Sequence, residues 1–287
     1  MQVLVTGASG FVGKTLCQVL LARGHKVRAL SSTPPPAACQ WILRKQHPIP
    51  WPSLLQEVEA VVHLGGKSRG KAEELWSANA ILAEELAQAL AQSQVRHVLF
   101  LSTAKVYGEG GMDMVREDTA PRPISFYAKS KLAAEEALKA SRVPLAIFRV
   151  PPILGPEMKG NLKRLFSWAA KGRPILTPRG TRRALVALPN LVQVVCLAME
   201  KKKEGVFVLA DAHPTLAELA QEASLAAGKK AHVLEVPGIF FQYFPPLKRL
   251  ASPFLLDDAK SRAVLGFSET ADWRKTLHQA VSWISFP

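Results

Sequence analysis

The chain has 287 residues, 48% of them hydrophobic, with a mean hydropathy of +0.07 and a formal net charge of +14 at pH 7. These values are typical of a soluble globular protein, and no apolar run is long enough to cross a bilayer. The three cysteines are scattered, and the seven histidines show no metal-ligand spacing. We therefore expect buried thiols in a reducing compartment, no metal site, no signal peptide before the apolar opening segment, and a cytoplasmic location.

The excess of positive charge is spread along the chain. A basic surface attracts nucleic acid, anionic lipid or a phosphorylated substrate. The sequence has no basic stripe interleaved with aromatic residues of the kind that binds single-stranded nucleic acid. We therefore expect a small-molecule partner and no nucleic-acid partner.

The chain opens with an apolar strand over residues 2–6, which leads into a glycine-rich turn and an amphipathic helix. Gly7, Gly10 and Gly13 mark positions where the backbone turns tightly or lets another group come close. The unpaired amides and the positive dipole end of a helix N-terminus attract phosphate. In a doubly wound fold this arrangement holds the pyrophosphate of a dinucleotide.

The same turn has a competing interpretation as the phosphate loop of a nucleoside triphosphatase. Residues 8–15 match that motif except that Ala8 stands where the motif has glycine, and Lys14 and Thr15 would then bind a terminal phosphate and magnesium. Such an enzyme also needs an aspartate at the end of a second apolar strand, and the chain offers none. We disfavour this interpretation, and likewise a glycine-rich turn without a ligand.

Strand-like and helix-like segments alternate through the first half of the chain, which predicts a parallel sheet covered on both faces. The expected strands are 2–6, 26–31, 41–44, 60–64, 97–102 and 145–150, and the expected helices include 72–92 and 127–140. The proline-rich connection 31–38 is too short for a crossover helix.

These segments predict an α/β fold with a Rossmann-type doubly wound parallel sheet and a smaller C-terminal α/β substrate lobe. Residues 1–154 are expected to form the NAD(P)-binding Rossmann domain, and 155–287 mainly the substrate-binding lobe. The segment 184–210 is expected to return to the first domain as a helix and a strand.

Asn79 interrupts the apolar stripe of helix 72–92, which otherwise presents leucines. A buried amide needs hydrogen-bond partners, so an inward-facing Asn79 should bond to the backbone of a neighbouring strand. A partly exposed position at the helix edge fits the pattern almost equally well.

Tyr127 and Lys131 are four residues apart at the start of helix 127–140 and therefore share a face. A free tyrosine has a pKa near ~10 and is a poor base. A nearby ammonium favours the phenolate, so we expect Lys131 to lower the pKa of Tyr127. Ser102 and Thr103 end a strand at the carboxyl edge of the sheet, where ligands bind in open α/β folds. Thr103 is thus placed to bond the substrate oxygen that Tyr127 protonates.

Together these motifs resemble the extended short-chain dehydrogenase/reductases, and within them the nucleotide-sugar epimerase/dehydratase family, of the UDP-glucose 4-epimerase type. The resemblance covers nearly the whole chain. It is carried by 6–13, 61–66, Asn79, 101–108, 127–131, 149–156, 159–161, Arg182-Arg183 and the closing helix at 273–283.

The resemblance implies that Tyr127 is the acid–base group, that Lys131 is its electrostatic partner, and that Thr103 orients the substrate. It places Asn161 and Arg183 near a substrate diphosphate, for which a guanidinium is well suited. The residues implied to bind NAD or NADP are Gly7, Ser9, Gly10, Phe11, Val12, Ser31, Ser32, Leu64, Gly65, Gly66, Ser102, Tyr127, Lys131, Pro151 and Ile153.

One departure from the family pattern bears on the reaction. The family's 4,6-dehydratases carry an Asp-Glu pair, and its decarboxylases a Glu, just after the catalytic threonine. This chain has Ala104 and Lys105 there. Without a carboxylate to move a second proton, both chemistries are disfavoured, and Lys105 becomes a substrate contact.

A second departure bears on the cofactor. An NAD-specific member places an acid near Ser31 to hold the ribose diol, but Ser31 and Ser32 carry no carboxylate that would repel a 2′-phosphate. The nearby cations Arg28, Arg44 and Lys45 are candidates to accept that phosphate. NAD and NADP both stay open, with a preference for NADP.

The expected function is epimerisation of a nucleotide- or lipid-diphosphate-linked sugar by transient hydride transfer. The same residues fit an NADP-dependent ketone or keto-sugar reductase. An alternative of another class is a non-catalytic dinucleotide-sensing or scaffold protein, against which the retained Tyr127, Lys131 and Thr103 argue.

The segment 239–256 is apolar and aromatic, then basic. Such a composition suits a membrane interface, and peripheral membrane contact would fit a polyprenyl-linked substrate. We favour the alternative, in which these side chains cover the substrate pocket or pack within the small lobe. The resemblance also implies a homodimer that pairs through two helices.

Overall fold

The central sheet of the computed structural model has seven parallel strands in the order β11–β7–β5–β4–β1–β2–β3. The structure describes residues 1–287 except 36–37, 45–47, 244–250, 269–270 and 286–287. The strands of the sheet are β1 (Gln2–Thr6), β2 (Lys26–Ser31), β3 (Gln40–Leu43), β4 (Ala60–His63), β5 (His97–Thr103), β7 (Leu145–Val150) and β11 (Gly205–Val208). Their parallel pairing confirms the expected Rossmann-type doubly wound fold.

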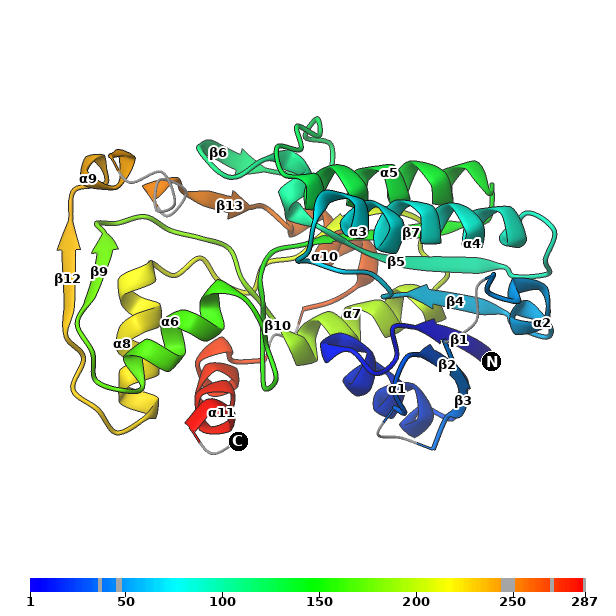
Figure 1. Ribbon diagram of the computed structural model, residues 1–287, viewed down its shortest axis with the longest axis horizontal. Coiled ribbons are helices and arrows are strands. Elements are labelled where there is room, and N and C mark those ends of the chain that lie inside the picture. Colours follow the sequence, from blue (N-terminus) through cyan, green and yellow to red (C-terminus); the bar gives the residue numbers. More distant parts are fainter. Residues whose placement is uncertain (36–37, 45–47, 244–250, 269–270, 286–287) are drawn as a thin grey trace.

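Helices cover both faces of this sheet (Figure 1). One face carries α1 (Phe11–Ala22), α7 (Leu188–Glu200) and α10 (Ala259–Leu265), and the other carries α2 (Trp51–Leu55), α4 (Leu82–Leu90) and α5 (Phe126–Ala140). Leu16 and Leu191 anchor the first layer, and Leu86 and Leu138 the second; all four are fully buried. Two apolar layers therefore hold the sheet rigid and leave its carboxyl edge to bind ligand.

The expected single helix over 72–92 consists of three consecutive segments. These are α3 (Ala72–Trp76), a π-helical turn η1 (Ser77–Ile81) and α4. The wider turn contains Asn79, which is only 1% exposed. A fixed helical period does not predict such a turn, and π turns of this kind often occur at functional sites. By contrast, the connection 31–38 contains no helix among its described residues, as expected.

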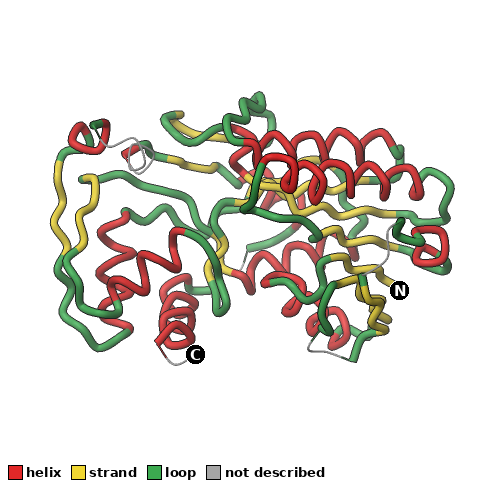
Figure 2. Tube along the Cα trace, in the orientation of Figure 1, coloured by secondary structure: helices red, strands yellow, loops and turns green. Residues whose placement is uncertain are grey.

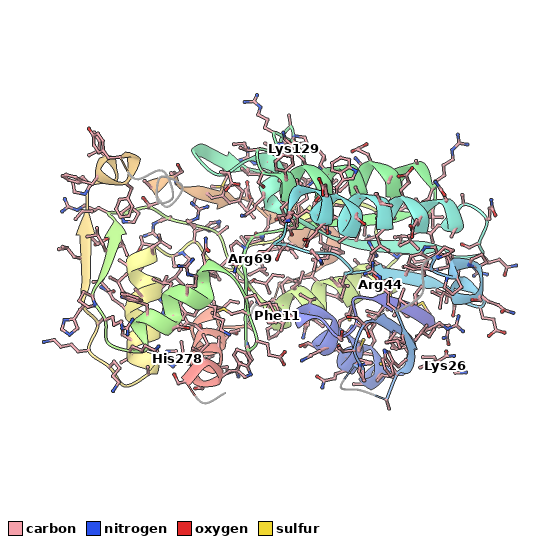
Figure 3. All side chains as sticks on the ribbon, viewed as in Figure 1. Phe11, Lys26, Arg44, Arg69, Lys129 and His278 are labelled. Atoms are coloured by element: carbon pink, nitrogen blue, oxygen red, sulfur yellow. The ribbon has the colours of Figure 1, made fainter. Side chains whose placement is uncertain are left out.

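A smaller lobe lies beside the sheet (Figure 2). Its elements are α6 (Asn161–Ala169), β9 (Ile175–Pro178), α8 (Leu216–Ala226), β12 (Val233–Val236), α9 (Ile239–Gln242) and α11 (Trp273–Ser285). Fully buried Phe166, Leu277 and Val281 lie in its core. Phe11, at the start of α1, packs against both this core and the core of the sheet, so α1 begins where the two parts meet (Figure 3).

Three short strand pairs lie outside the central sheet. β8 (Ile153–Leu154) pairs with β10 (Val186–Ala187), β13 (Phe254–Leu256) with β6 (Met112–Val115), and β12 with β9. After β10 the chain returns to the sheet, where α7 packs on α1 and β11 extends the sheet beyond β7. Among the helices formed by described residues, none has the length and apolarity that a membrane span requires.

The three cysteines are free thiols. Cys17 and Cys196 are buried, as expected, whereas Cys39 is only half-buried. Burial raises the pKa of all three thiols, that of Cys196 to about 11, so they are protonated at neutral pH.

Candidate active site

A cavity of about 430 Å³ opens at the carboxyl edge of the sheet, between the sheet and the lobe. It is lined by Gly7, Gly10, Phe11, Val12, Gly13, Leu64, Gly65, Gly66, Lys67, Ser68, Asn79, Leu101, Ser102, Thr103, Ala104, Lys105, Gly108, Glu109, Tyr127, Lys131, Val150, Pro151, Pro152, Ile153, Lys159, Arg183 and Phe254. This is the edge where ligands bind in open α/β sheets.

The start of α1 forms one wall of the cavity. Gly7 has φ +69°, and a Cβ at Gly13 would lie 2.3 Å from the Gly7 carbonyl oxygen, so both positions require glycine. The helix has no side-chain cap, and its first residues Phe11 and Val12 line the cavity. Its first amides are therefore available to an anion, as the pyrophosphate of a dinucleotide requires.

Lys14 does not line this cavity. Its amine donates to the carboxylate of Glu157, 2.7 Å away in the loop after β8. A triphosphatase would need this lysine at the phosphates, so the geometry gives that interpretation no support.

Thr103, Tyr127 and Lys131 meet in the opposite wall of the cavity. Thr103 ends β5, and Tyr127 and Lys131 lie one turn apart at the start of α5, which Ser125 caps by accepting from the Ala128 amide. The Lys131 amine is buried and lies 4.0 Å from the centroid of the Phe100 ring. The three side chains that the sequence singled out are thus brought to one place.

Burial dominates the protonation of this group. It lowers the pKa of Lys131 from 10.5 to about 7, against the opposing charge of Glu135. It also raises the pKa of Tyr127, while a hydrogen bond from Thr103 to the phenol oxygen opposes that rise. The expected lowering of the Tyr127 pKa by Lys131 is therefore wrong, because desolvation of the phenolate outweighs the effects that lower its pKa.

A buried ion pair lies behind Lys131. Glu135, one turn further along α5, accepts from both the Nε and the Nη2 of Arg149 on β7, at 3.1 and 2.6 Å for Oε2. The Ser102 hydroxyl donates to the same carboxylate, and the Arg149 guanidinium stacks 4.9 Å from the Tyr107 ring centroid. Glu135 was not predicted as a site residue, although it stands one helical turn after Lys131 in the sequence.

Asn79 connects the loop after β4 with α5. Its Oδ1 accepts from the Lys67 amide at 3.0 Å, and its Nδ2 donates to the Lys67 carbonyl and to Ser130 Oγ, both at 2.9 Å. The expected backbone partner is present, but it lies in the loop beyond the strand. Asn79 thereby ties the loop of Gly65 and Gly66, which lines the cavity, to the helix that carries Tyr127.

On the lobe side of the cavity, the Arg183 side chain is held in place by Ser252 and Phe254. The Arg183 guanidinium donates to the Ser252 carbonyl at 2.6 Å and lies 5.9 Å from the Phe254 ring centroid. Burial lowers its pKa, and the charge of Glu109 opposes this. Lys159 and Phe254 line the cavity too, although neither was named as a site residue. Proximity to Asn161 was a signal for Lys159, and Phe254 lies in the segment 239–256, which was expected to cover the pocket.

Four predicted residues lie outside the lining of the cavity. They are Ser9, Ser31, Ser32 and Asn161. Ser31 is buried, and its hydroxyl donates to the Thr33 carbonyl at 2.7 Å. Their roles stay predictions. Within the described part of the chain, no group of three or more His, Cys, Asp or Glu side chains is placed to hold a metal.

Similarity to known proteins agrees with this geometry. The chain is 24% identical over 249 residues to an uncharacterised protein, y4nG, of Sinorhizobium fredii, covering 82% of this chain and 62% of that one. It is 31% identical over 155 residues to UDP-glucose 4-epimerase of Corynebacterium glutamicum, covering 48% of this chain and 46% of that one. The matched regions therefore span about half to three fifths of these relatives.

A solved structure supports the fold. UDP-glucuronic acid 4-epimerase from Bacillus cereus in complex with NAD superposes with a TM-score of 0.84 at 23% identity, over 99% of this chain and 97% of that one. The family model of the NAD dependent epimerase/dehydratase family matches residues 3–210. The chain therefore belongs to the NAD-dependent epimerase/dehydratase family.

Proposed function

We propose that the chain is an NAD(P)-dependent epimerase of a sugar linked to a nucleotide or lipid diphosphate. One observation carries the proposal: Thr103, Tyr127 and Lys131 line the same cavity as the uncapped start of α1. Residues 1–154, with 184–210, are the cofactor-binding unit of this proposal, and 155–287 mainly bind substrate. The similarity to two 4-epimerases supports the reaction.

The glycine turn and the start of α1 fit a dinucleotide, because a side chain at Gly13 would fill the space next to the Gly7 carbonyl. A bound nicotinamide supplies hydride acceptance and return at a sugar carbon. Tyr127, as phenolate, takes the proton of the sugar hydroxyl and later returns it. Lys131 stabilises the phenolate when protonated, and Thr103 donates a hydrogen bond to the same oxygen.

The substrate end of the cavity is cationic. Lys67, Lys105, Lys159 and Arg183 line it, against the single carboxylate of Glu109. Such a lining favours an anionic substrate, and a diphosphate matches the guanidinium of Arg183. Lys105 follows Thr103 directly, and it is the proposed contact to the sugar. We place Asn161, at the first position of α6, near the diphosphate on the family resemblance alone.

NADP is the preferred dinucleotide of the proposal. Arg28 is committed elsewhere, since its guanidinium donates to the carbonyls of Leu54 and Gln56 at 2.7 and 3.0 Å. Arg44 donates its amide to the Ser31 carbonyl at 2.9 Å, which places it beside the end of β2. Lys45 lies outside the described residues. Arg44 is therefore the proposed partner of a 2′-phosphate.

Mass spectrometry of the dinucleotide that co-purifies, followed by turnover of a nucleotide-sugar panel, tests the proposal. An epimerase converts the sugar with no net change in reduced nicotinamide. Stoichiometric consumption of NADPH with release of a reduced product would make it a reductase. Biological activity that survives Tyr127→Phe would identify a dinucleotide-sensing protein.

The proposed homodimer predicts twice the chain mass in light scattering.

A further inference from the structure

The outer edge of the lobe presents an exposed apolar strip. β9 and β12 pair in register so that Leu176 lies opposite Leu234, with exposed fractions of 53% and 63%. The short helix α9 follows β12. Its Ile239 and Phe240 are 57% and 55% exposed, and Tyr243, directly after the helix, is 76% exposed. These elements form one end of the molecule, at the left of Figure 1. We call the five residues the apolar strip.

Internal packing accounts for only part of the segment 239–256. Phe241 and Leu256 are buried, and Phe254 lines the cavity, as expected for side chains that pack in the lobe or cover the pocket. That explanation is wrong for the described residues Ile239, Phe240 and Tyr243, which face solvent. An exposed apolar patch of this kind typically marks an interaction surface.

Exposed cations flank the strip at both ends. Lys171 and Arg173 precede β9, Lys229 and Lys230 precede β12, and Arg179 follows β9. The first two turns are adjacent, because a Cβ at Gly172 would lie 3.9 Å from the Lys229 Cβ. The segment 161–183 contains seven Lys and Arg and no Asp or Glu.

We propose that this face docks on an anionic phospholipid bilayer, with the apolar strip among the headgroups and the flanking cations on the lipid phosphates. Apolar and aromatic side chains combined with cations are the two components of interfacial membrane binding. A second copy of the chain is a poorer occupant, because self-pairing of this face would bring like charges together. Glu235 is the one acid on the two strands, and its carboxylate is engaged by the Gly180 amide at 3.5 Å.

Flotation with vesicles of phosphatidylcholine and phosphatidylglycerol tests the proposal without substrate, so its outcome is independent of the catalytic function. We expect the protein to float with the anionic vesicles at low salt and to remain behind with pure phosphatidylcholine. Raising the salt from about 0.1 M to about 1 M, which shortens the Debye length from about 10 to about 3 Å, should release it. Absence of flotation at low salt, or equal flotation with neutral vesicles, would overturn the proposal.

Two variants separate the components. Phe240→Ser/Tyr243→Ser removes exposed aromatic rings, and Lys229→Glu/Lys230→Glu reverses exposed charges; each should weaken vesicle partitioning roughly tenfold or more. Trp41→Ser, on β3 at the other end of the molecule from the apolar strip (Figure 1), is the control for loss of an exposed aromatic ring. Lys26→Glu, on β2 (Figure 3), is the control for charge reversal. Both variants should partition normally. Unchanged partitioning of both lobe variants refutes the proposal. So does a dimer that the Phe240→Ser/Tyr243→Ser variant abolishes, since the face would then bind a second copy.

Discussion

Glu135 and Arg149 form a two-pronged ion pair that is almost fully shielded from water, with side chains 0% and 5% exposed. The pair joins α5 to β7 directly behind Lys131, and Glu135 favours the protonated form of that lysine. The Glu135 carboxylate therefore both links α5 to β7 and stabilises the charge of Lys131.

Removal of one partner of this pair should be costly. Arg149→Met leaves the Glu135 carboxylate buried without its counter-charge, and we expect a loss of about 3–5 kcal/mol in the free energy of unfolding. The double variant Arg149→Met/Glu135→Gln should regain much of that loss. Urea unfolding followed by circular dichroism measures both. Equal stabilities of the single and double variants would contradict the buried pair.

The buried lysine predicts a pH-dependent stability. The pKa of Lys131 is about 7 in the folded chain and 10.5 when unfolded. Between these two values the unfolded chain binds a proton that the folded chain lacks, so the free energy of unfolding rises with pH across this window. Below this pH window, the free energy of unfolding is reduced by the full cost of burying the charged Lys131 amine. Urea titrations should show a smaller rise for Lys131→Met than for the parent chain, and identical pH profiles would refute this.

The catalytic assignment predicts a selective loss of turnover. Tyr127→Phe removes the hydroxyl that exchanges the proton, so kcat should fall by roughly 10²–10⁴-fold while dinucleotide affinity is retained. Tyr107→Phe is the matched control, because the Tyr107 hydroxyl bonds the Glu117 carbonyl away from the proposed chemistry. Stopped-flow turnover and fluorescence titration of the cofactor give the two readouts. A Tyr127→Phe enzyme with full kcat would remove Tyr127 from the mechanism.

The glycine cradle predicts a steric effect on binding. In Gly13→Ala the new methyl would lie 2.3 Å from the Gly7 carbonyl oxygen, so the turn must shift away from the phosphate-binding position. We expect a loss of stability of about 1–3 kcal/mol and weaker dinucleotide binding by calorimetry. Lys14→Ala, at the next residue, should bind normally, because Lys14 pairs with Glu157. A binding defect confined to the Lys14 variant would instead revive the triphosphatase interpretation.

Cofactor preference should depend on Arg44. Arg44→Ala removes the proposed partner of the 2′-phosphate, and a charge-assisted hydrogen bond contributes about 1.5–3 kcal/mol, so NADP should bind roughly tenfold or more weakly. The affinity for NAD should stay unchanged. The control Arg96→Ala, directly before β5 at the amino end of the strands, should leave the affinities for NAD and NADP unchanged. Parallel loss of NAD and NADP binding would show that Arg44 supports the fold.

Much of the fold followed from pattern because its determinants are local. The alternation of apolar strands and helices gave the parallel sheet, and the spacing of Tyr127 and Lys131 placed both on one helix face. Thr103 joined them because parallel strands end at a common edge. Which residues meet at this edge depends on the order of the strands in the sheet. The order of the strands along the chain already restricts that arrangement.

The remainder depends on long-range contacts. The π turn at Asn79 is stabilised by bonds to Lys67 and Ser130, which no local period encodes. The protonation of Tyr127 depends on how deeply the phenol is buried. Phe254 reaches the cavity through the pairing of β13 with β6, two short strands far apart in sequence.

The close fit between Gly66 and Asn79 restricts how this chain can diverge. A methyl group at Gly66 would lie 2.3 Å from the Asn79 amide oxygen, and Gly66 has φ +149°. A larger residue at 66 would push out the amide that fastens the loop to α5, and a shorter residue at 79 would leave the Lys67 backbone without its partners. A change at either site alone should therefore loosen the loop, and at Gly66 the positive φ opposes any side chain even when residue 79 is shortened.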